Sequence, residues 1–493
     1  MRRTVLAVLV VCLFAFQAAW PQAQDAVTFK DDRAVPPGRQ GERIRSLIDT
    51  VNAGDADLFR RFLEEECQER FRNFVPLDQH LDVFLRLVRE SGGVDFYSVR
   101  TYTPERPGQT VVIVKDRNYG NWRAFTFRFT PAPENLVASL GFGSAQAPAD
   151  VPAPPLTEDQ VLQETKDLAR RLTERGLFSG ALLIAKGEQV LLTMAGGEAS
   201  KAFHVPNTVD TKFNLGSMNK MFTSTAVMRL AEQGRLSLDD PLGKYVDDSW
   251  LPPDVTAKIT IRHLLTHTSG LGSYFNETYM RSSRALFKKL DDYKPLVKDE
   301  KPAFAPGTRY QYSNTGMFLL GVVIEKVTGE DYFDHIRKVI YGPAGMTNTD
   351  CYEMDYPVEN LAIGFSPDPK SPFGWQNNLY KHVIKGGPAG GGFSTVKDLH
   401  RFAMALLAGT YVSKDSLKLM WTDYLGAGYG YGFTVSSGGA GKVVGHSGGF
   451  PGINSKLDIY LAAGYIVAVM SNIDSGASPV AAAVGQKLAR LRK

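Results

Sequence analysis

Residues 213–220 read FNLGSMNK and lead into an apolar run, Met221–Leu230, that is typical of a helix. Ser217 and Lys220 are three positions apart, so on a helix their side chains share one face about one turn from each other. A serine hydroxyl is a weak nucleophile at its ordinary pKa and needs a neighbouring base. A lysine amine acts as that base only when burial or a nearby cation disfavours its ammonium form. The stretch therefore predicts a serine nucleophile paired with a lysine at the start of a helix.

The same spacing occurs a second time, at Ser394 and Lys397, so spacing alone does not identify the nucleophile. The second copy lies in residues 390–398, which read GGGFSTVKD. In that setting Ser394 or Thr395 fits better as the N-cap of a helix, because a short hydroxyl side chain there accepts a hydrogen bond from the first turn. We expect a structural role for Ser394.

A polar triplet follows a turn in residues 306–314, which read PGTRYQYSN and precede an apolar run. Tyr312 offers a phenol that could act as an acid or base if cations depress its pKa. Asn314 offers an amide that can both donate and accept hydrogen bonds to a substrate. Taken alone, the triplet fits equally a core tyrosine followed by a helix N-cap.

A third segment, residues 443–449, reads VVGHSGG on a predicted strand. Small residues along a strand edge let a substrate backbone approach closely. The backbone N–H of Gly449, together with that of Ser217, could hold a developing oxyanion, and losing one such donor typically costs about 2.7–4 kcal/mol of transition-state stabilisation. The segment also fits the Gly-x-Ser-x-Gly elbow of α/β-hydrolases, but that elbow requires a helix after the turn. More strand follows here, so Ser447 is not the expected nucleophile.

The three ordered motifs SMNK (217–220), YSN (312–314) and HSG (446–448) resemble those of the serine β-lactamase and penicillin-binding-protein superfamily. The match is closest to its class C-like branch of β-lactamases, D-stereospecific peptidases and esterases. Three supporting stretches are similar to the same branch: LLTHTSGL (264–271), FAPGT (304–308) and residues 386–394. The resemblance covers about residues 160–493.

The resemblance implies that Ser217 is the nucleophile that forms an acyl-enzyme. It implies that Lys220 and Tyr312 share the proton transfers of acylation and deacylation. It also implies that Asn314 orients the substrate amide. No cofactor is implied.

The resemblance further implies that His446 and Gly448 mark the strand beside the cleft and that Gly449 is an oxyanion donor. Many β-lactamases and carboxypeptidases carry Lys-Thr-Gly where this chain has His446-Ser447-Gly448. An imidazole of ordinary pKa is mostly neutral at pH 7, so a fixed ammonium for a substrate carboxylate is missing. Esterases and D-aminopeptidases of the branch have a histidine here. We therefore expect ester or peptide hydrolysis ahead of β-lactam hydrolysis.

The fold class expected for residues 157–493 is α/β of the α+β type. Thr157 begins a capping box and a helix, and a hairpin spans residues 181–194 around a Lys-Gly-Glu turn. Strand patterns near the other end are followed by a terminal helix over residues 479–490. We expect an antiparallel sheet built from both ends, flanked by terminal helices, with a mostly helical insert.

A Pro/Ala-rich linker, residues 144–156, divides the chain, because SAQAPADVPAPPL favours an extended spacer. Residues 25–143 show three segments of helical periodicity and then strand patterns, such as alternating Phe125, Phe127 and Phe129. This arrangement resembles the small α+β domains of the nuclear-transport-factor-2-like fold. The domain shows no cluster of reactive side chains, so we expect a packing or substrate-presenting module.

The start of the chain has the pattern of a secretory signal peptide, predicted over residues 1–24. Arg2 and Arg3 precede an apolar stretch, Thr4–Phe16, and small residues follow up to Ala23. The apolar stretch is shorter than the roughly 20 residues of a membrane span. A periplasmic or secreted location follows, with no stable span in the mature chain; an uncleaved anchor is the alternative.

The 493 residues carry a formal net charge of +4, which argues against a strongly basic nucleic-acid-binding protein. After signal removal only Cys67 and Cys351 remain, and two free buried thiols are expected. His263 and His267 are four apart, as in some metal sites, but the glutamate of the zinc-protease motif is absent. Structural histidines and no metal are expected.

The preferred hypothesis is an exported serine hydrolase that acts through an acyl-enzyme on Ser217. Its substrate would be an ester, a D-amino-acid amide or peptide, or a β-lactam. The first alternative is a non-catalytic protein that binds β-lactams or cell-wall peptides, and it would acylate without turnover. The second is that residues 25–143 are the functional part and the hydrolase a scaffold. A small molecule or peptide is the expected partner.

Overall fold

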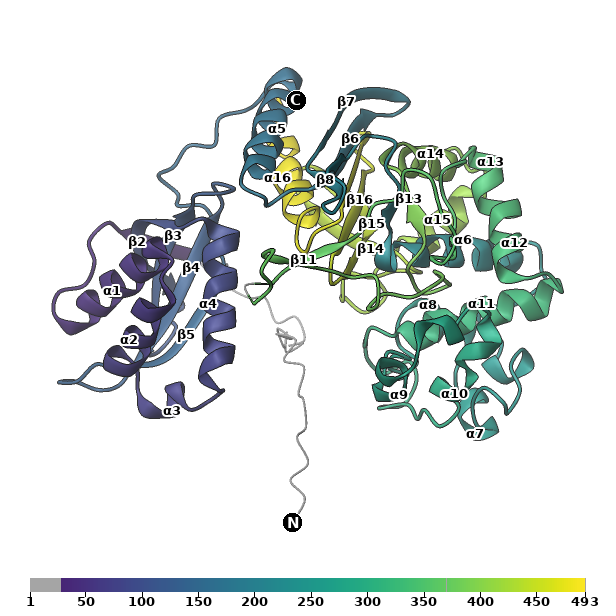
Figure 1. Cartoon of the computed structure of the whole chain (residues 1–493), viewed down its shortest axis with the longest axis horizontal. Helices are drawn as coiled ribbons and strands as arrows, with labels where there is room; N and C mark the ends of the chain where they lie inside the picture. The colour runs from purple at the N-terminus through teal and green to yellow at the C-terminus, as the bar shows by residue number, and fades with distance from the viewer. Residues whose placement is uncertain (1–27, 369, 493) are drawn as a thin grey trace, which may run out of the picture. The chain divides into compact units, whose positions relative to one another are not determined.

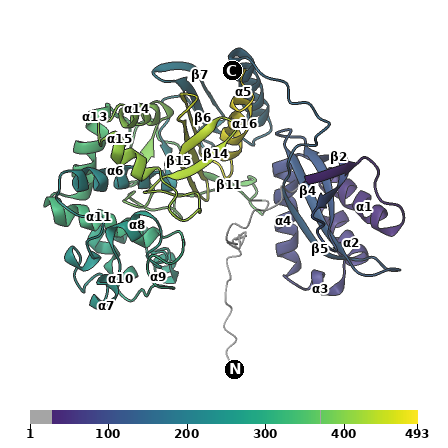
Figure 2. The ribbon, with the colours of Figure 1, turned by 180° about the vertical axis from the view of Figure 1, so that it is seen from behind.

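The structure is a computed structural model that describes residues 28–368 and 370–492. The predicted signal peptide, residues 1–24, lies outside the described residues. The chain forms two compact units, and it passes from the first to the second between Val151 and Pro152 (Figures 1 and 2). Among the described residues no helix combines the length and the apolar character needed to cross a membrane.

The first unit packs four helices against a five-stranded antiparallel sheet with strand order β1-β2-β3-β4-β5. Its elements are β1 (Thr28–Asp32), α1 (Arg39–Ala53), α2 (Ala56–Glu66), α3 (Glu69–Arg72), α4 (Leu77–Ser91), β2 (Val94–Thr103), β3 (Thr110–Asp116), β4 (Trp122–Phe129) and β5 (Val137–Ser144). The three expected helices correspond to α1, α2 and α4. Their apolar faces and the sheet form one core that includes Ile44, Phe62, Phe84 and Phe125.

The sequence did not indicate β1, which precedes the helices and pairs with β2. Five residues with the sequence TFKDD are too short and too polar to show a strand period. The strand is held instead by partners distant in sequence. Asp31 forms an ion pair with the fully buried side chain of Arg100 at 2.8 Å, and the Arg100 guanidinium lies 3.7 Å from the centre of the Phe29 ring.

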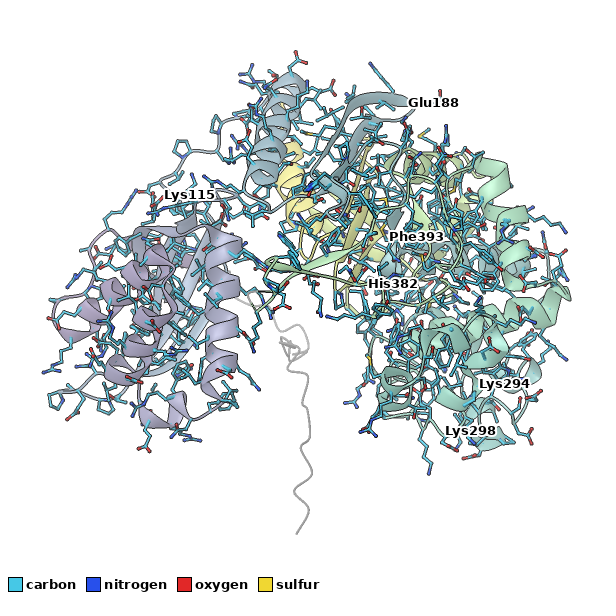
Figure 3. The ribbon with its side chains drawn as sticks, viewed as in Figure 1. Lys115, Glu188, Lys294, Lys298, His382 and Phe393 are labelled. Atoms are coloured by element: carbon cyan, nitrogen blue, oxygen red, sulfur yellow. The ribbon has the colours of Figure 1, made fainter. Side chains whose placement is uncertain are left out.

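The second unit contains a six-stranded antiparallel sheet with strand order β14-β15-β16-β17-β6-β7. These strands are β6 (Gly180–Lys186), β7 (Gln189–Gly196), β14 (Thr434–Gly438), β15 (Gly441–Phe450), β16 (Ile453–Tyr460) and β17 (Tyr465–Ser471). Pairing of β17 with β6 joins the two ends of the unit, as expected. The predicted hairpin is also confirmed, and Glu188 lies at its tip (Figure 3).

Helices cover both faces of this sheet. Helices α5 (Glu158–Glu174) and α16 (Ser478–Leu488) lie side by side on one face, and α14 (Val396–Leu407) lies on the other (Figure 1). This explains why β6 and β17 are buried almost throughout rather than on alternate residues. The predicted capping box of α5 is present, with Thr157 as the N-cap residue.

Most of the regular secondary structure between β7 and β14 is helical, as expected. Its elements are β8 (Glu198–Ser200), β9 (Val205–Pro206), β10 (Phe213–Asn214), α6 (Asn219–Glu232), α7 (Pro253–Thr256), α8 (Ile261–Leu265), α9 (Glu277–Arg281), α10 (Lys294–Val297), α11 (Asn314–Thr328), α12 (Tyr332–Ile336), α13 (Gly342–Ala344), β11 (Phe365–Pro367), β12 (Trp375–Asn377), β13 (Phe393–Ser394), α14 and α15 (Lys414–Met420). Helices α7 to α11 gather at one end of the unit in both ribbon views (Figures 1 and 2). Cys351, in this region, and Cys67, in the first unit, are free and buried, as predicted.

Strand β15 passes unusually close to the backbone that precedes α6. A Cβ atom at Gly448 would lie 1.9 Å from the Leu215 carbonyl oxygen and 2.4 Å from Ser455 Oγ. Only glycine permits this approach, because both atoms are held in place by the fold around them. Ser455 Oγ itself donates a 2.6 Å hydrogen bond to the Leu215 carbonyl.

We expect Gly448→Ala to lower the free energy of unfolding by about 1–3 kcal/mol or more, the usual cost of overpacking. The matched control is Gly438→Ala in β14, where a Cβ would meet no atom within 4 Å. Its effect is expected to stay within about 0.5 kcal/mol. Thermal unfolding of both variants beside the wild type measures the difference. Equal melting temperatures would contradict the close approach of β15.

Candidate active site

A cavity of about 200 Å³ in the second unit is lined by residues of the first two predicted motifs and by Gly449, which directly follows the third. Ser217, Tyr312, Asn314 and Gly449 line it. Three other predicted site residues do not line the cavity and are buried: Lys220, His446 and Gly448. The cavity thus has an outer set of residues that a substrate can touch and an inner set that can act only through them.

Ser217 lies in a single 3₁₀ turn, Gly216–Met218, that leads directly into α6. The turn is possible because Gly216 has a φ of +52° and sits against Gly448 and Gly449; a Cβ there would lie 2.9 Å from the Gly449 nitrogen. Ser217 is partly exposed at the N-terminal end of the helix. Negative charge that develops on its oxygen is favoured there by the helix dipole.

Lys220 is completely buried in the first turn of α6. Its Nζ donates hydrogen bonds to Asn314 Oδ1 at 2.9 Å and to the Ala389 carbonyl oxygen at 2.5 Å. Burial lowers the pKa of Lys220 well below its ordinary value. A neutral amine has two N–H donors and one lone pair. Since two acceptors occupy the donors, the lone pair remains free to take a proton.

The Tyr312 phenol contacts the Ser217 side chain, and its ring centre lies 4.8 Å from Lys220 Nζ. Desolvation by the surrounding side chains raises the pKa of Tyr312 above its ordinary value, although the residue is 38% exposed, and this outweighs the lowering by the Ser217 contact. The condition that cations depress this pKa is therefore not met, because desolvation outweighs the lowering contribution. Tyr312 is a protonated phenol that can both donate and accept a proton.

The triplet YSN contains both a helix N-cap and side chains that line the cavity, the two roles that the sequence suggested for it. Ser313 is the N-cap of α11, and its Oγ accepts a 2.8 Å hydrogen bond from the Gly316 N–H. Asn314, the first residue of the helix, donates from Nδ2 to Ser273 Oγ at 3.2 Å. One side chain of the triplet thus begins the helix while its two neighbours face the cavity.

His446 is buried on β15 with both ring nitrogens engaged. Its Nδ1–H donates to the Ser447 carbonyl oxygen at 2.6 Å, and its Nε2 accepts from the Tyr429 hydroxyl at 2.9 Å. Burial, reinforced by Lys220, lowers the pKa of His446 to about 3. The histidine is therefore neutral, and it supplies no cation to the cavity.

Neither alternative serine is placed for nucleophilic attack. Ser394 is fully buried and shares a 2.8 Å hydrogen bond with Thr349 Oγ1, while Lys397 forms a surface ion pair with Asp210. Thr395, the other proposed cap, is the N-cap of α14. Ser447 lies within β15, and no helix follows that strand, so the α/β-hydrolase elbow is absent here.

His267 is a neighbour of the site that the sequence indicated only as a structural residue. It is buried with a φ of +58°, and its Nδ1 accepts a 3.1 Å hydrogen bond from the Ser313 N–H. Its ring centre lies 4.4 Å from that of Tyr312. His263, by contrast, caps α8 with its side chain. No group of three or more potential metal ligands occurs among the described residues.

A glycine-rich loop, residues 386–392, forms another wall of the cavity and supplies the Ala389 carbonyl to Lys220. Asn219, within the first motif, fixes this loop: its Nδ2 donates to the Gly387 carbonyl at 3.1 Å and its Oδ1 accepts from the Gly392 N–H at 3.3 Å. The sequence offered the loop only as a supporting stretch. The loop contacts Lys220 through a backbone carbonyl, so no residue type in the sequence marks this contact.

Comparison with known proteins agrees with this geometry. Residues 163–490 match the Beta-lactamase family. The chain belongs to this family. Penicillin-binding protein 4* of Bacillus subtilis strain 168 is 32% identical over 311 residues, which is 60% of this chain and 68% of that protein. Membership makes the second unit a β-lactamase-related serine hydrolase and confirms the predicted fold class.

Two solved structures resemble the chain. The structure of a penicillin binding protein from Bacillus halodurans aligns with a TM-score of 0.59 and 29% identity, over 66% of this chain and 98% of that one. The D-amino acid amidase from Ochrobactrum anthropi SV3, with L-phenylalanine amide bound, aligns with a TM-score of 0.56 and 26% identity. That alignment covers 67% of this chain and 97% of the amidase.

Proposed function

We propose that this β-lactamase-related hydrolase cleaves an ester, a D-amino-acid amide or peptide, or a β-lactam through an acyl-enzyme on Ser217. The observation that carries the proposal is the buried amine of Lys220, whose pKa is well below its ordinary value, behind the Ser217–Tyr312 contact. A base with a free lone pair beside a partly exposed serine is what nucleophilic catalysis needs.

In the proposed acylation, Ser217 Oγ attacks the substrate carbonyl carbon and its proton passes through the Tyr312 hydroxyl to Lys220 Nζ. The N–H groups of Ser217 and Gly449 hold the resulting oxyanion. When the intermediate collapses, the leaving alcohol or amine takes the proton back from Lys220. In deacylation a water molecule gives its proton along the same path and its oxygen attacks the acyl carbon, which releases the acid and restores Ser217.

The remaining predicted residues have supporting roles in this proposal. Asn314 lines the cavity and accepts a hydrogen bond from Lys220, so it orients the base and, we propose, the substrate. Gly448 lets β15 reach the serine. His446 keeps that strand in place through its bond from Tyr429.

Reaction with a fluorophosphonate tests the proposal. Ser217 Oγ displaces fluoride from phosphorus, and intact mass should show a single adduct that peptide mapping locates on Ser217. Several equivalents of product per enzyme should then form from an activated ester. The absence of an adduct on folded protein would contradict an activated serine. An acyl adduct without turnover would favour the non-catalytic binding protein.

We also propose that the protein is exported, and that residues 25–143 form an accessory domain joined by the linker 144–156 to the hydrolase domain 157–493. The support is the sequence of residues 1–24 and the composition of the linker. Intact mass of the protein recovered from the periplasm or medium should correspond to a chain that lacks about the first 24 residues. Recovery of the full-length chain in the cytoplasm alone would contradict export.

A further inference from the structure

The wall of the active-site cavity is largely aromatic and aliphatic. Tyr274, Phe275, Val383, Phe450 and Ile453 line it. The rings of Tyr274 and Phe275 lie 4.5 Å apart, and those of Phe275 and Phe450 lie 5.8 Å apart. These rings come from two segments that are far apart in the sequence, and together they form one apolar surface beside Ser217. A cavity of roughly 150 Å³ already binds benzene when its lining is apolar.

The polar side chains of the wall are all uncharged. They are hydroxyls, amides and one imidazole, contributed by Asn214, Ser217, Tyr274, Tyr312, Asn314 and His382. His382 lies between the sheet and the helical end of the unit (Figure 3). Its Nδ1–H donates to the Val383 carbonyl at 2.6 Å, and burial lowers its pKa below the ordinary value. Among the described residues that line the cavity there is no carboxylate, ammonium or guanidinium group.

Charged groups close to the cavity are directed to other partners. Lys381, next to His382, donates to Gln376 Oε1 at 2.5 Å. The Arg284 guanidinium donates to the carbonyls of Tyr279 and Ser282. Glu300, behind the segment that carries Tyr274, accepts a hydrogen bond from the Gly272 N–H, and burial raises its pKa. None of these groups lines the cavity.

A charged substrate group that enters such a cavity loses its hydration and gains no opposite charge in return. An apolar group gains from the same burial. We propose that the hydrolase selects substrates with no formal charge near the scissile bond and with an apolar group against Tyr274, Phe275 and Phe450: neutral esters, or amides whose amine is blocked. This inference rests on the acyl-enzyme mechanism on Ser217 proposed above.

Free amino-acid amides carry an ammonium group, and penicillin-type β-lactams and peptides with a free C-terminus carry a carboxylate. All three classes are therefore disfavoured by the same wall. Of the substrate classes that the motifs leave open, the inference keeps the uncharged esters and amides.

Two matched pairs of esters, of which the first is isosteric, test the inference with the whole mature protein. The first pair is p-nitrophenyl 4-(trimethylammonio)butanoate and p-nitrophenyl 5,5-dimethylhexanoate, which differ only in a fixed positive charge. The second is p-nitrophenyl hydrogen glutarate and p-nitrophenyl methyl glutarate, which differ in a carboxylate. After division by the rate of alkaline hydrolysis, kcat/KM is expected to favour each neutral ester by at least about tenfold. Equal values, or a preference for a charged ester, would overturn the inference and leave the acyl-enzyme intact. Failure of all four esters to acylate Ser217 would overturn the proposed function itself.

A charge placed in the wall provides the reciprocal test. Phe450→Arg is expected to raise kcat/KM for the glutarate monoester relative to its methyl ester by about tenfold, while Phe450→Leu keeps the wild-type ratio. Leu425→Arg adds the same charge at a half-exposed position that does not line the cavity, and it should also keep the ratio. A thermal melt shows that each variant is folded. An unchanged ratio in folded Phe450→Arg would mean that the substrate does not lie against this wall and would overturn the inference.

Discussion

Replacement of Ser217 by alanine is expected to lower kcat by at least about 10⁴-fold, because the attacking oxygen is removed while the rest of the site remains. The fold should be nearly unaffected. Ser217 is partly exposed and its hydroxyl contacts Tyr312. Even the loss of a full hydrogen bond typically costs only about 0.5–1.5 kcal/mol. Steady-state hydrolysis of a neutral p-nitrophenyl ester, with a thermal melt of the same preparation, measures both quantities.

Two control variants test whether the loss of activity is specific to Ser217. Ser447→Ala should keep the wild-type kcat, because Ser447 lies within β15 and does not line the cavity. Ser394→Ala should also keep it, although the loss of the buried contact with Thr349 should lower the free energy of unfolding by about 1 kcal/mol. A Ser217→Ala enzyme that retains the wild-type rate would rule out the assignment of the nucleophile.

Lys220→Met is expected to lower kcat by about 10²–10⁴-fold, the usual contribution of a positioned base. It should also change how stability depends on pH. The folded state lowers the pKa of Lys220, whereas the unfolded lysine titrates near its ordinary value of about 10.4. Between these two pKa values the unfolded chain binds one more proton, so the free energy of unfolding of the wild type rises with pH across that window. Methionine cannot titrate, so that part of the rise should disappear.

The pH dependence is a better measure than stability at a single pH. Methionine removes the cost of burying an amine, but it also leaves Asn314 Oδ1 and the Ala389 carbonyl without their donor. Denaturant unfolding of the wild type and the variant at several pH values isolates the contribution of Lys220. Lys397→Met, in the second Ser-x-x-Lys copy, should keep the wild-type kcat. Parallel pH profiles for wild type and Lys220→Met would contradict a lowered pKa.

Features that depend on neighbours in the sequence could be predicted well. The capping box at Thr157, the hairpin over residues 181–194 and the strand that carries residues 443–449 each follow from a short local pattern. The pairing of strands from both ends of the second unit was also expected, because terminal strand patterns enclose a region without them. The order of three motifs then indicated which of two Ser-x-x-Lys copies is at the site.

Features that depend on close approach between distant segments could not be predicted. The Ala389 carbonyl that receives Lys220 is a backbone atom, and no residue type marks it. His446 is buried beside Tyr429, which lies outside the motif. The strongly lowered pKa of His446 therefore could not be predicted from the residues of the motif. Strand β1 likewise depends on Arg100, which lies about seventy positions further along the chain.

The pairing of β17 with β6 has a consequence for the order of events during synthesis. Strand β6 begins at Gly180, but its partner in the sheet begins only at Tyr465, so the hairpin of β6 and β7 waits for most of the unit to emerge. Sheets closed by such distant pairs form slowly. The turn that carries Ser217 also needs β15, whose Gly448 fits against Leu215. The turn that carries Ser217 can therefore take its native form only after the ribosome has passed β15, more than two hundred positions further along the chain.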